Sequence, residues 1–336
     1  DGTKTLLASG PGVVAIRGVV ADGDGGGKVA LTNSGGGYMN LEYYASTFSG
    51  PITNSGGSMS LVYGATALNV GNIYLGGSET LNQTSSFVLR NDTSNVQRLN
   101  SNVSITGLGR SYLDLRGNAA ESSTVTIGTY TPELGVDIIR SYGANGAATD
   151  AMPVLTISNL IRPDGGILNL AGGAVSSEGR QAKYNLGQGS GAGYAQIKAT
   201  QINGAAPEDA MVNGIIPWAI AAAGPSGSGN FTTYTENGFK PYGFDATGAV
   251  DDNGGTEPFV ATIAAGTSTS NVRITADETV DGTATINSLT LNGSRTIDGS
   301  GTIQLTSGAM ISESYGNIYP DLDFQGREGI VYTANN

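Results

Sequence analysis

The chain of 336 residues carries a formal net charge of −12 at pH 7 and contains neither cysteine nor histidine. It therefore has no disulfides and no thiolate metal ligands, and it cannot use catalysis built on cysteine or histidine. Its 16 lysine and arginine residues are spread singly along the chain, so we expect no nucleic-acid partner, and we predict no membrane span because no run approaches about 20 apolar residues.

Short segments that alternate apolar and polar residues recur along the chain between turns of glycine, asparagine, aspartate and serine. Each segment predicts a half-buried β-strand. Two stretches repeat about 20 residues apart: residues 32–36 return as residues 53–57, and Met39-x-Leu41-x-Tyr43 returns as Met59-x-Leu61-x-Tyr63. A repeat of this length predicts one coil of a parallel β-solenoid. The alternative is a Greek-key sandwich, which also has short alternating strands.

A second repeat lies near the C-terminal end, where residues 289–293 are echoed by residues 303–308, a displacement of 14 residues. Leu289, Leu291, Ile303 and Leu305 alternate with polar residues in these two segments. The alternation places all four on one face of their strands. We therefore expect them to point inward and to stack in register on successive coils.

Residues 205–257 interrupt this rhythm with a dense run of aromatic side chains, so we divide the chain into three parts. Residues 1–204 are predicted to form β-solenoid coils, residues 205–257 an irregular aromatic-rich loop or insertion, and residues 258–336 further coils that continue the same core. Two interpretations of the aromatic side chains stay open: packing where coils change length, or a patch that contacts a glycan or another partner. The residues concerned are Trp218, Phe231, Tyr234, Phe239 and Tyr242.

Three stretches of the sequence resemble the autotransporter-associated β-strand repeats of large secreted bacterial proteins. They are the glycine-punctuated Leu-x-Leu strands of residues 286–308, residues 213–219 (NGIIPWA) with the following residues 230–234, and residues 326–333. The resemblance covers roughly residues 103–333. It implies an all-β fold, namely a right-handed parallel β-helix, together with export and a place on the bacterial cell surface, and it implies no catalytic residue.

Two acidic features are candidates for site chemistry. Asp22 and Asp24 lie in a glycine-rich turn and could hold a structural Ca²⁺ through their carboxylates. We expect no other cofactor. Adjacent acids such as Glu208 and Asp209 would suit a polysaccharide-active enzyme if two carboxylates converged, although acids beside turn residues are ordinarily solvated.

The function expected from these features is that of a structural repeat unit in an extracellular bacterial fibre, coat or surface filament. An adhesin that binds glycans or other cells is the alternative, and a polysaccharide-active β-helix enzyme comes third. The sequence starts without a signal peptide, so we expect a mature product or a piece of a longer precursor. Apolar strands near both ends, residues 6–16 and 329–333, predict head-to-tail self-association or continuation into further repeats.

Overall fold

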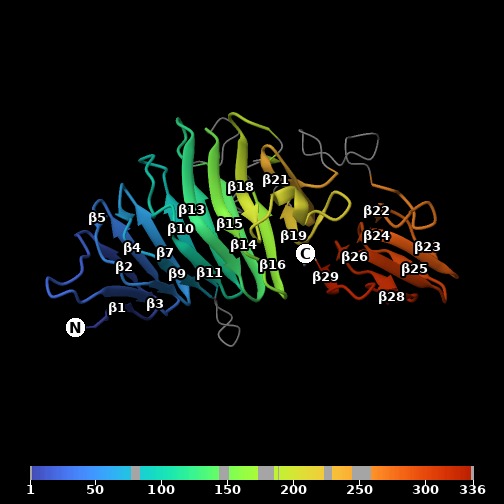
Figure 1. The fold of residues 1–336 in the computed structure, drawn as a ribbon, viewed down its shortest axis with the longest axis horizontal. Helices are drawn as coiled ribbons and strands as arrows, with labels where there is room; N and C mark the ends of the chain where they lie inside the picture. Colours follow the sequence, from blue (N-terminus) through green and yellow to red (C-terminus); the bar gives the residue numbers. More distant parts are fainter. Residues whose placement is uncertain are drawn as a thin grey trace.

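The computed structural model describes residues 2–76, 84–143, 151–172, 185–187, 189–222, 229–243 and 259–333. These residues are almost entirely β-strand, and the single helix among them is the short 3-10 helix η1 (Pro207–Ala210). Within the same residues no helix has the length and apolar character needed to cross a bilayer. Figure 1 shows an elongated molecule whose strands lie side by side along its length. The prediction of an all-β fold is confirmed.

Two sheets, which we call sheet A and sheet B, form an N-terminal stack, and the chain passes from one to the other in each coil. In pairing order, sheet A contains β1 (Lys4–Ala8), β3 (Val29–Asn33), β6 (Ile52–Asn54), β9 (Asn72–Leu75), β11 (Ser104–Gly107), β13 (Ser123–Pro132), β15 (Pro153–Leu160), β18 (Tyr194–Ile202) and β17 (Asn185–Leu186). Sheet B contains β2 (Val13–Ile16), β4 (Tyr38–Glu42), β7 (Gly57–Val62), β10 (Ser85–Arg90), β12 (Ser111–Arg116), β14 (Gly135–Tyr142), β16 (Gly166–Ala171), β19 (Ile216–Ala222), β20 (Gly229–Thr235) and β21 (Gly238–Pro241). A small pair, β5 (Ala45–Ser46) and β8 (Thr66–Ala67), adds a third face to two coils.

The strands of sheets A and B pair in parallel up to β19, which is the pairing of stacked coils and not that of a Greek-key sandwich. The observed register also confirms the predicted repeat, because Thr32 pairs with Thr53 and Met39 pairs with Met59. Inward side chains therefore form columns along the stack. The column on sheet A includes Leu31, Ile52, Ile73 and Ile105, and the column on sheet B includes Met39, Met59, Phe87 and Leu113, all buried.

The C-terminal residues form a second, shorter stack of coils. Its larger sheet contains β22 (Asn271–Ile274), β24 (Thr283–Leu291), β26 (Thr302–Ser312), β28 (Asp321–Asp323) and β29 (Ile330–Thr333); its smaller sheet contains β23 (Glu278–Thr279), β25 (Thr296–Asp298) and β27 (Asn317–Ile318). In Figure 1 the strands β22, β24, β26 and β28 follow one another across the long axis of the N-terminal stack. We expected these coils to continue the first core, but their inward residues form a second buried cluster of their own.

The register of this second stack differs from the one expected. Leu289, Leu291, Ile303 and Leu305 are all buried, as the alternation predicts. However, Ile303 pairs with Ala284, and Leu289 pairs with Met310. The expected stacking at a displacement of 14 residues was wrong because β24 and β26 each contain two inward segments, and the echo matched the second segment of β24 with the first segment of β26.

The two stacks are joined by specific contacts. The Arg162 guanidinium lies 2.6 Å from the Glu328 carboxylate. The Asn213 side-chain amide donates to Asn287 Oδ1 at 3.0 Å. Ile311 and Ile330 pack into the core of the N-terminal stack, although their strands belong to the C-terminal stack. The C-terminal coils are therefore docked against the end of the N-terminal stack.

Candidate functional site

Residues 223–228 and 244–257 of the expected loop lie outside the described residues; in the described part the aromatic side chains lie on or directly beside the regular strands β19, β20 and β21 and belong to the core. β20 pairs antiparallel with β19 and with β21. The Tyr234 hydroxyl donates to the Ala199 carbonyl at 2.6 Å and accepts from the Ala199 N–H at 3.1 Å, so this hairpin reaches from sheet B to β18 of sheet A. Phe231 and Phe239 are buried in the core. The hairpin therefore closes this end of the N-terminal stack, which needs such a cap to protect its core.

The five aromatic residues that were candidates for glycan contact do not form an exposed patch. Trp218 is 8% exposed and Tyr242 is 7% exposed. The Arg162 guanidinium lies 5.7 Å from the centre of the Trp218 ring, and Tyr242 meets Phe259 edge to face. Their ring faces are used within the protein, so the structure corrects the interpretation of Trp218, Phe231, Tyr234, Phe239 and Tyr242 as a stacking surface and favours aromatic packing.

Asp22 has a structural role in the glycine-rich turn. Its carboxylate accepts hydrogen bonds from the Ser49 hydroxyl at 2.6 Å and from the backbone N–H groups of Val29 and Ser49. These bonds, that of the Ser49 hydroxyl first, lower the pKa of Asp22. Asp24 is exposed, and no group of three or more acids gathers anywhere in the described residues. Ca²⁺ takes six to eight oxygen ligands, so the pair Asp22 and Asp24 supplies few of them.

Other acids near turns satisfy backbone donors. Asp277 accepts from Thr296 N, and Glu278 accepts from Ile263 N at 2.9 Å. Burial raises the pKa of Glu278. Asp323 accepts from Gln325 N. Each of these three carboxylates therefore has a local structural role in a turn.

A buried polar cluster inside the N-terminal stack was not anticipated from the sequence. Asp137 points into the core, where Oδ1 accepts from the Ser111 hydroxyl at 2.6 Å and from Gly109 N at 3.1 Å. The buried Tyr130 hydroxyl lies beside it, and burial raises the pKa of Tyr130. Burial also raises the pKa of Asp137 to about 6. The signal in the sequence was an aspartate at an inward position of an alternating strand, two residues before Ile139.

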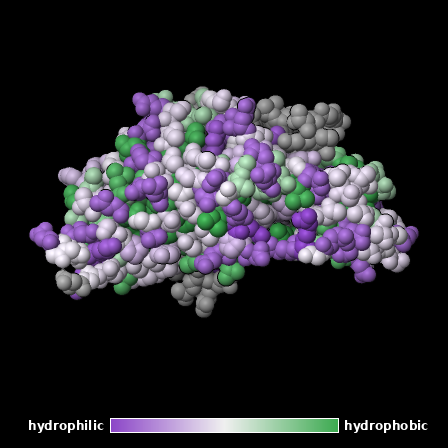
Figure 2. Space-filling model, in the orientation of Figure 1, coloured by the Kyte–Doolittle hydropathy of each residue, from purple (hydrophilic) through white to green (hydrophobic). Residues whose placement is uncertain are grey.

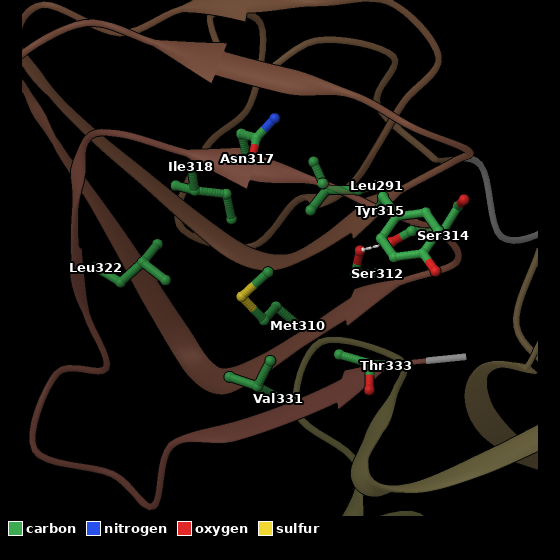
Figure 3. Close-up of a pocket in the computed structure, with 11 residues that line it drawn as sticks. Leu291, Met310, Ser312, Ser314, Tyr315, Asn317, Ile318, Leu322, Val331 and Thr333 are labelled. Carbon is green, nitrogen blue, oxygen red and sulfur yellow. Dashed lines mark hydrogen bonds between the residues drawn. The ribbon is translucent and has the colours of Figure 1, made fainter. Parts of the chain in front are cut away.

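The last coil of the C-terminal stack leaves a cavity of about 560 Å³ open at its end. Figure 3 shows Met310, Ile318, Leu322 and Val331 gathered around this cavity, with Ser314 and Tyr315 at its side. Val331 is 51% exposed although its register partner Met310 is 3% exposed. The cavity is thus the uncovered end of the second core.

The first coil is uncovered in the same way. Leu6 pairs with the fully buried Leu31, and Val14 pairs with Met39, which is 1% exposed. Leu6 is nevertheless 44% exposed and Val14 is 43% exposed. Both side chains occupy inward positions and lack a covering coil in the described residues. Elsewhere the visible face in Figure 2 mixes apolar and polar residues.

Comparisons with protein-family models, with curated proteins and with solved structures gave no match. The features of the described residues from which a function can be argued are two coil ends that expose inward apolar side chains, and buried polar groups that face the core.

Proposed function

We propose that the chain is a structural repeat unit of an extracellular bacterial fibre, coat or surface filament, folded as a right-handed parallel β-helix. The observation that carries this proposal is the exposure of inward apolar side chains on both the first and the last coil. Water contact with such side chains is unfavourable by about 25 cal/mol per Å², and an open strand edge is a template for pairing with another strand. Placement outside the cell rests on the resemblance to autotransporter-associated repeats.

Each end presents two successive strands that carry an inward apolar residue; β1 and β2 lie in sheets A and B, whereas β28 and β29 both pair with β26. The last coil presents β28 with Leu322 inward and then β29 with Val331 inward. The first coil presents β1 with Leu6 inward and then β2 with Val14 inward. If β1 of one copy pairs in parallel with β28 of another, and β2 with β29, the columns of inward residues continue across the junction.

The cavity and the charges also favour this junction. Leu6 and Val14 of one copy would enter the cavity beside Leu322 and Val331 of the other. The exposed Lys4 of β1 would come close to Asp321 of β28, and opposite charges at the rim of an interface favour the encounter. The partner in this proposal is a second copy of the chain, joined head to tail.

The test compares two adjacent valines of β2 whose side chains point to opposite faces of the strand. Val14 points inward, whereas Val13 pairs with the exposed Tyr38 and points outward. Analytical ultracentrifugation of the wild-type chain should show association that grows with concentration, and electron microscopy should show threads. Val14→Asp and Val331→Asp should each abolish the association, and Val13→Asp should leave it intact. A wild-type chain that stays monomeric at about 1 mM, or equal effects of Val13→Asp and Val14→Asp, would refute the proposed assembly.

The adhesin remains a second candidate because tyrosine side chains that are stacked on one another lie exposed on the coils. No arrangement described above favours the enzyme. Labelling of intact bacteria with an antibody against the chain tests the proposed surface location independently of assembly.

A further inference from the structure

Two exposed tyrosines stack on each other at one corner of the N-terminal stack. Tyr43 follows β4 and Tyr63 follows β7, at equivalent positions of consecutive coils because Glu42 pairs with Val62. Their ring centres are 4.9 Å apart and their planes differ by 13°. Tyr43 is 53% exposed and Tyr63 is 42% exposed. The pair forms a flat aromatic surface in contact with solvent, which we call the tyrosine platform.

Both rings point outward because the backbone at Tyr43 and Tyr63 adopts an unfavourable conformation. By strand alternation Tyr43 would share the inward face of Met39 and Leu41. Instead, φ is +70° at Tyr43 and +52° at Tyr63, a left-handed conformation that is unfavourable for a bulky side chain. Glycine or asparagine would make this turn more easily. Tyrosine is therefore not the residue that stabilises this turn best, and the two exposed rings bury little surface. Backbone strain of this kind concentrates at functional sites.

One face of the platform is open. The register that pairs Ile16 with Leu41 places Gly18 at the same corner in the first coil. A side chain there would touch nothing within 4 Å. On the other side, the equivalent position after β10 is Asn91, which is buried and hydrogen-bonded to Arg98. The stack therefore has two rings, and the residue at the equivalent position of the first coil, Gly18, has no side chain to place above Tyr43.

Polar groups border the rings. Arg17 Nε donates to Glu42 Oε2 at 2.8 Å, and the Arg17 side chain is 71% exposed. The pKa of Arg17 is raised first by its hydrogen bond to Glu42 and by the charge of Glu42, and further by Tyr43 and Tyr63. The register that pairs Ile16 with Leu41 places Arg17 beside Glu42, and Glu42 directly precedes Tyr43 in the chain. An aromatic face beside an exposed guanidinium offers an apolar surface together with directional hydrogen-bond donors.

We infer that the tyrosine platform, together with Arg17, binds a pyranose ring of a neutral glycan. The C–H face of the sugar lies on Tyr43, in the space beside Gly18, and its hydroxyl groups meet the exposed Arg17 guanidinium, which the buried Glu42 carboxylate holds in place. A neutral sugar fits better than an anionic polymer because Glu42 already neutralises Arg17 and the whole chain carries a net charge of −12. Rigid tyrosines lose little conformational entropy on binding.

The test uses three neutral oligosaccharides as probes, cellohexaose, xylohexaose and mannohexaose, with an oligogalacturonate as the anionic comparison. Isothermal titration calorimetry should give a Kd of about 1 mM or tighter for at least one neutral probe. Tyr43→Gly removes the ring and suits the positive φ, so the variant should fold as well as the wild type and bind at least about 10-fold more weakly. Arg17→Gln should weaken binding to a similar extent.

Tyr38→Ala is the matched control. Tyr38 lies at the start of β4 in the same coil, is 54% exposed, and is about 16 Å from Tyr43 along the strand. This variant should bind as the wild type does. Val14→Asp should also bind normally, because the platform does not depend on end-to-end assembly. No binding of any neutral probe, tighter binding of the oligogalacturonate, or equal binding by Tyr43→Gly and the wild type would overturn the inference.

Discussion

Asp137 gives the stability of the chain a definite dependence on pH. Its carboxylate is fully buried and bonds to Ser111 and Gly109 beside Tyr130. Burial raises its pKa from 3.8 to about 6. An acid whose pKa is higher in the folded state binds more protons folded than unfolded, so the free energy of unfolding falls as the pH rises through this range. A shift of about two units corresponds to a loss of about 3 kcal/mol by pH 7.

Replacement of Asp137 by asparagine isolates this effect. The amide oxygen can still accept from Ser111 and Gly109, and the side chain no longer ionises. Denaturant unfolding at pH 4 should give the wild type and Asp137→Asn similar stability. At pH 8 the variant should be more stable by up to about 3 kcal/mol. Asp24→Asn, at an exposed position, controls for the loss of one charge. If the wild type became more stable relative to Asp137→Asn as the pH rises from 4 to 7, the raised pKa of Asp137 would be refuted.

Two further substitutions test the inward columns. Leu155 is fully buried between Val125 and Ile197, so Leu155→Ala should cost about 2 to 5 kcal/mol in denaturant unfolding, whereas Thr156→Ala next to it should change stability by about 0.5 kcal/mol or less. Asn54 accepts a hydrogen bond from the Asn33 amide and donates one to the Ser86 carbonyl. Asn54→Ala should therefore lower the free energy of unfolding by about 1 to 3 kcal/mol. Asn72→Ala, at an exposed position, is the control, and an equal loss in both variants would contradict this role.

Local alternation and direct repeats were sufficient to predict the strands and part of the register. The match of residues 32–36 with residues 53–57 gave the observed pairing because both segments occupy the same face of consecutive coils. The echo at 14 residues failed because similar apolar pairs also occur on different segments of one coil. Pro217 lies in β19 at a register shift between Ile216 and Ile220, where a strand tolerates proline.

The sites depended on contacts that the sequence does not reveal. Asp22 is bound by Ser49, which lies 27 residues away in the next coil, so the acidic turn alone suggested a cation where a hydroxyl and two N–H groups suffice. For the aromatic run the sequence left both packing and a contact patch open, because its strands could not be placed at the end of the core. Conversely, strand alternation predicts that Tyr43 points inward like Met39 and Leu41, and the same holds for Tyr63. Only the positive φ angles of the two tyrosines bring their rings to the surface.

The corner between the two stacks has a mechanical consequence. Because β22, β24, β26 and β28 follow one another across the long axis of the N-terminal stack (Figure 1), copies joined from last coil to first coil would not continue in a straight line. A constant bend repeated at every copy generates a helix. Such a thread would behave as a spring, since tension would first open the corners held by Arg162 with Glu328 and by Asn213 with Asn287. It would lengthen and recover while the ladders within each stack stayed intact.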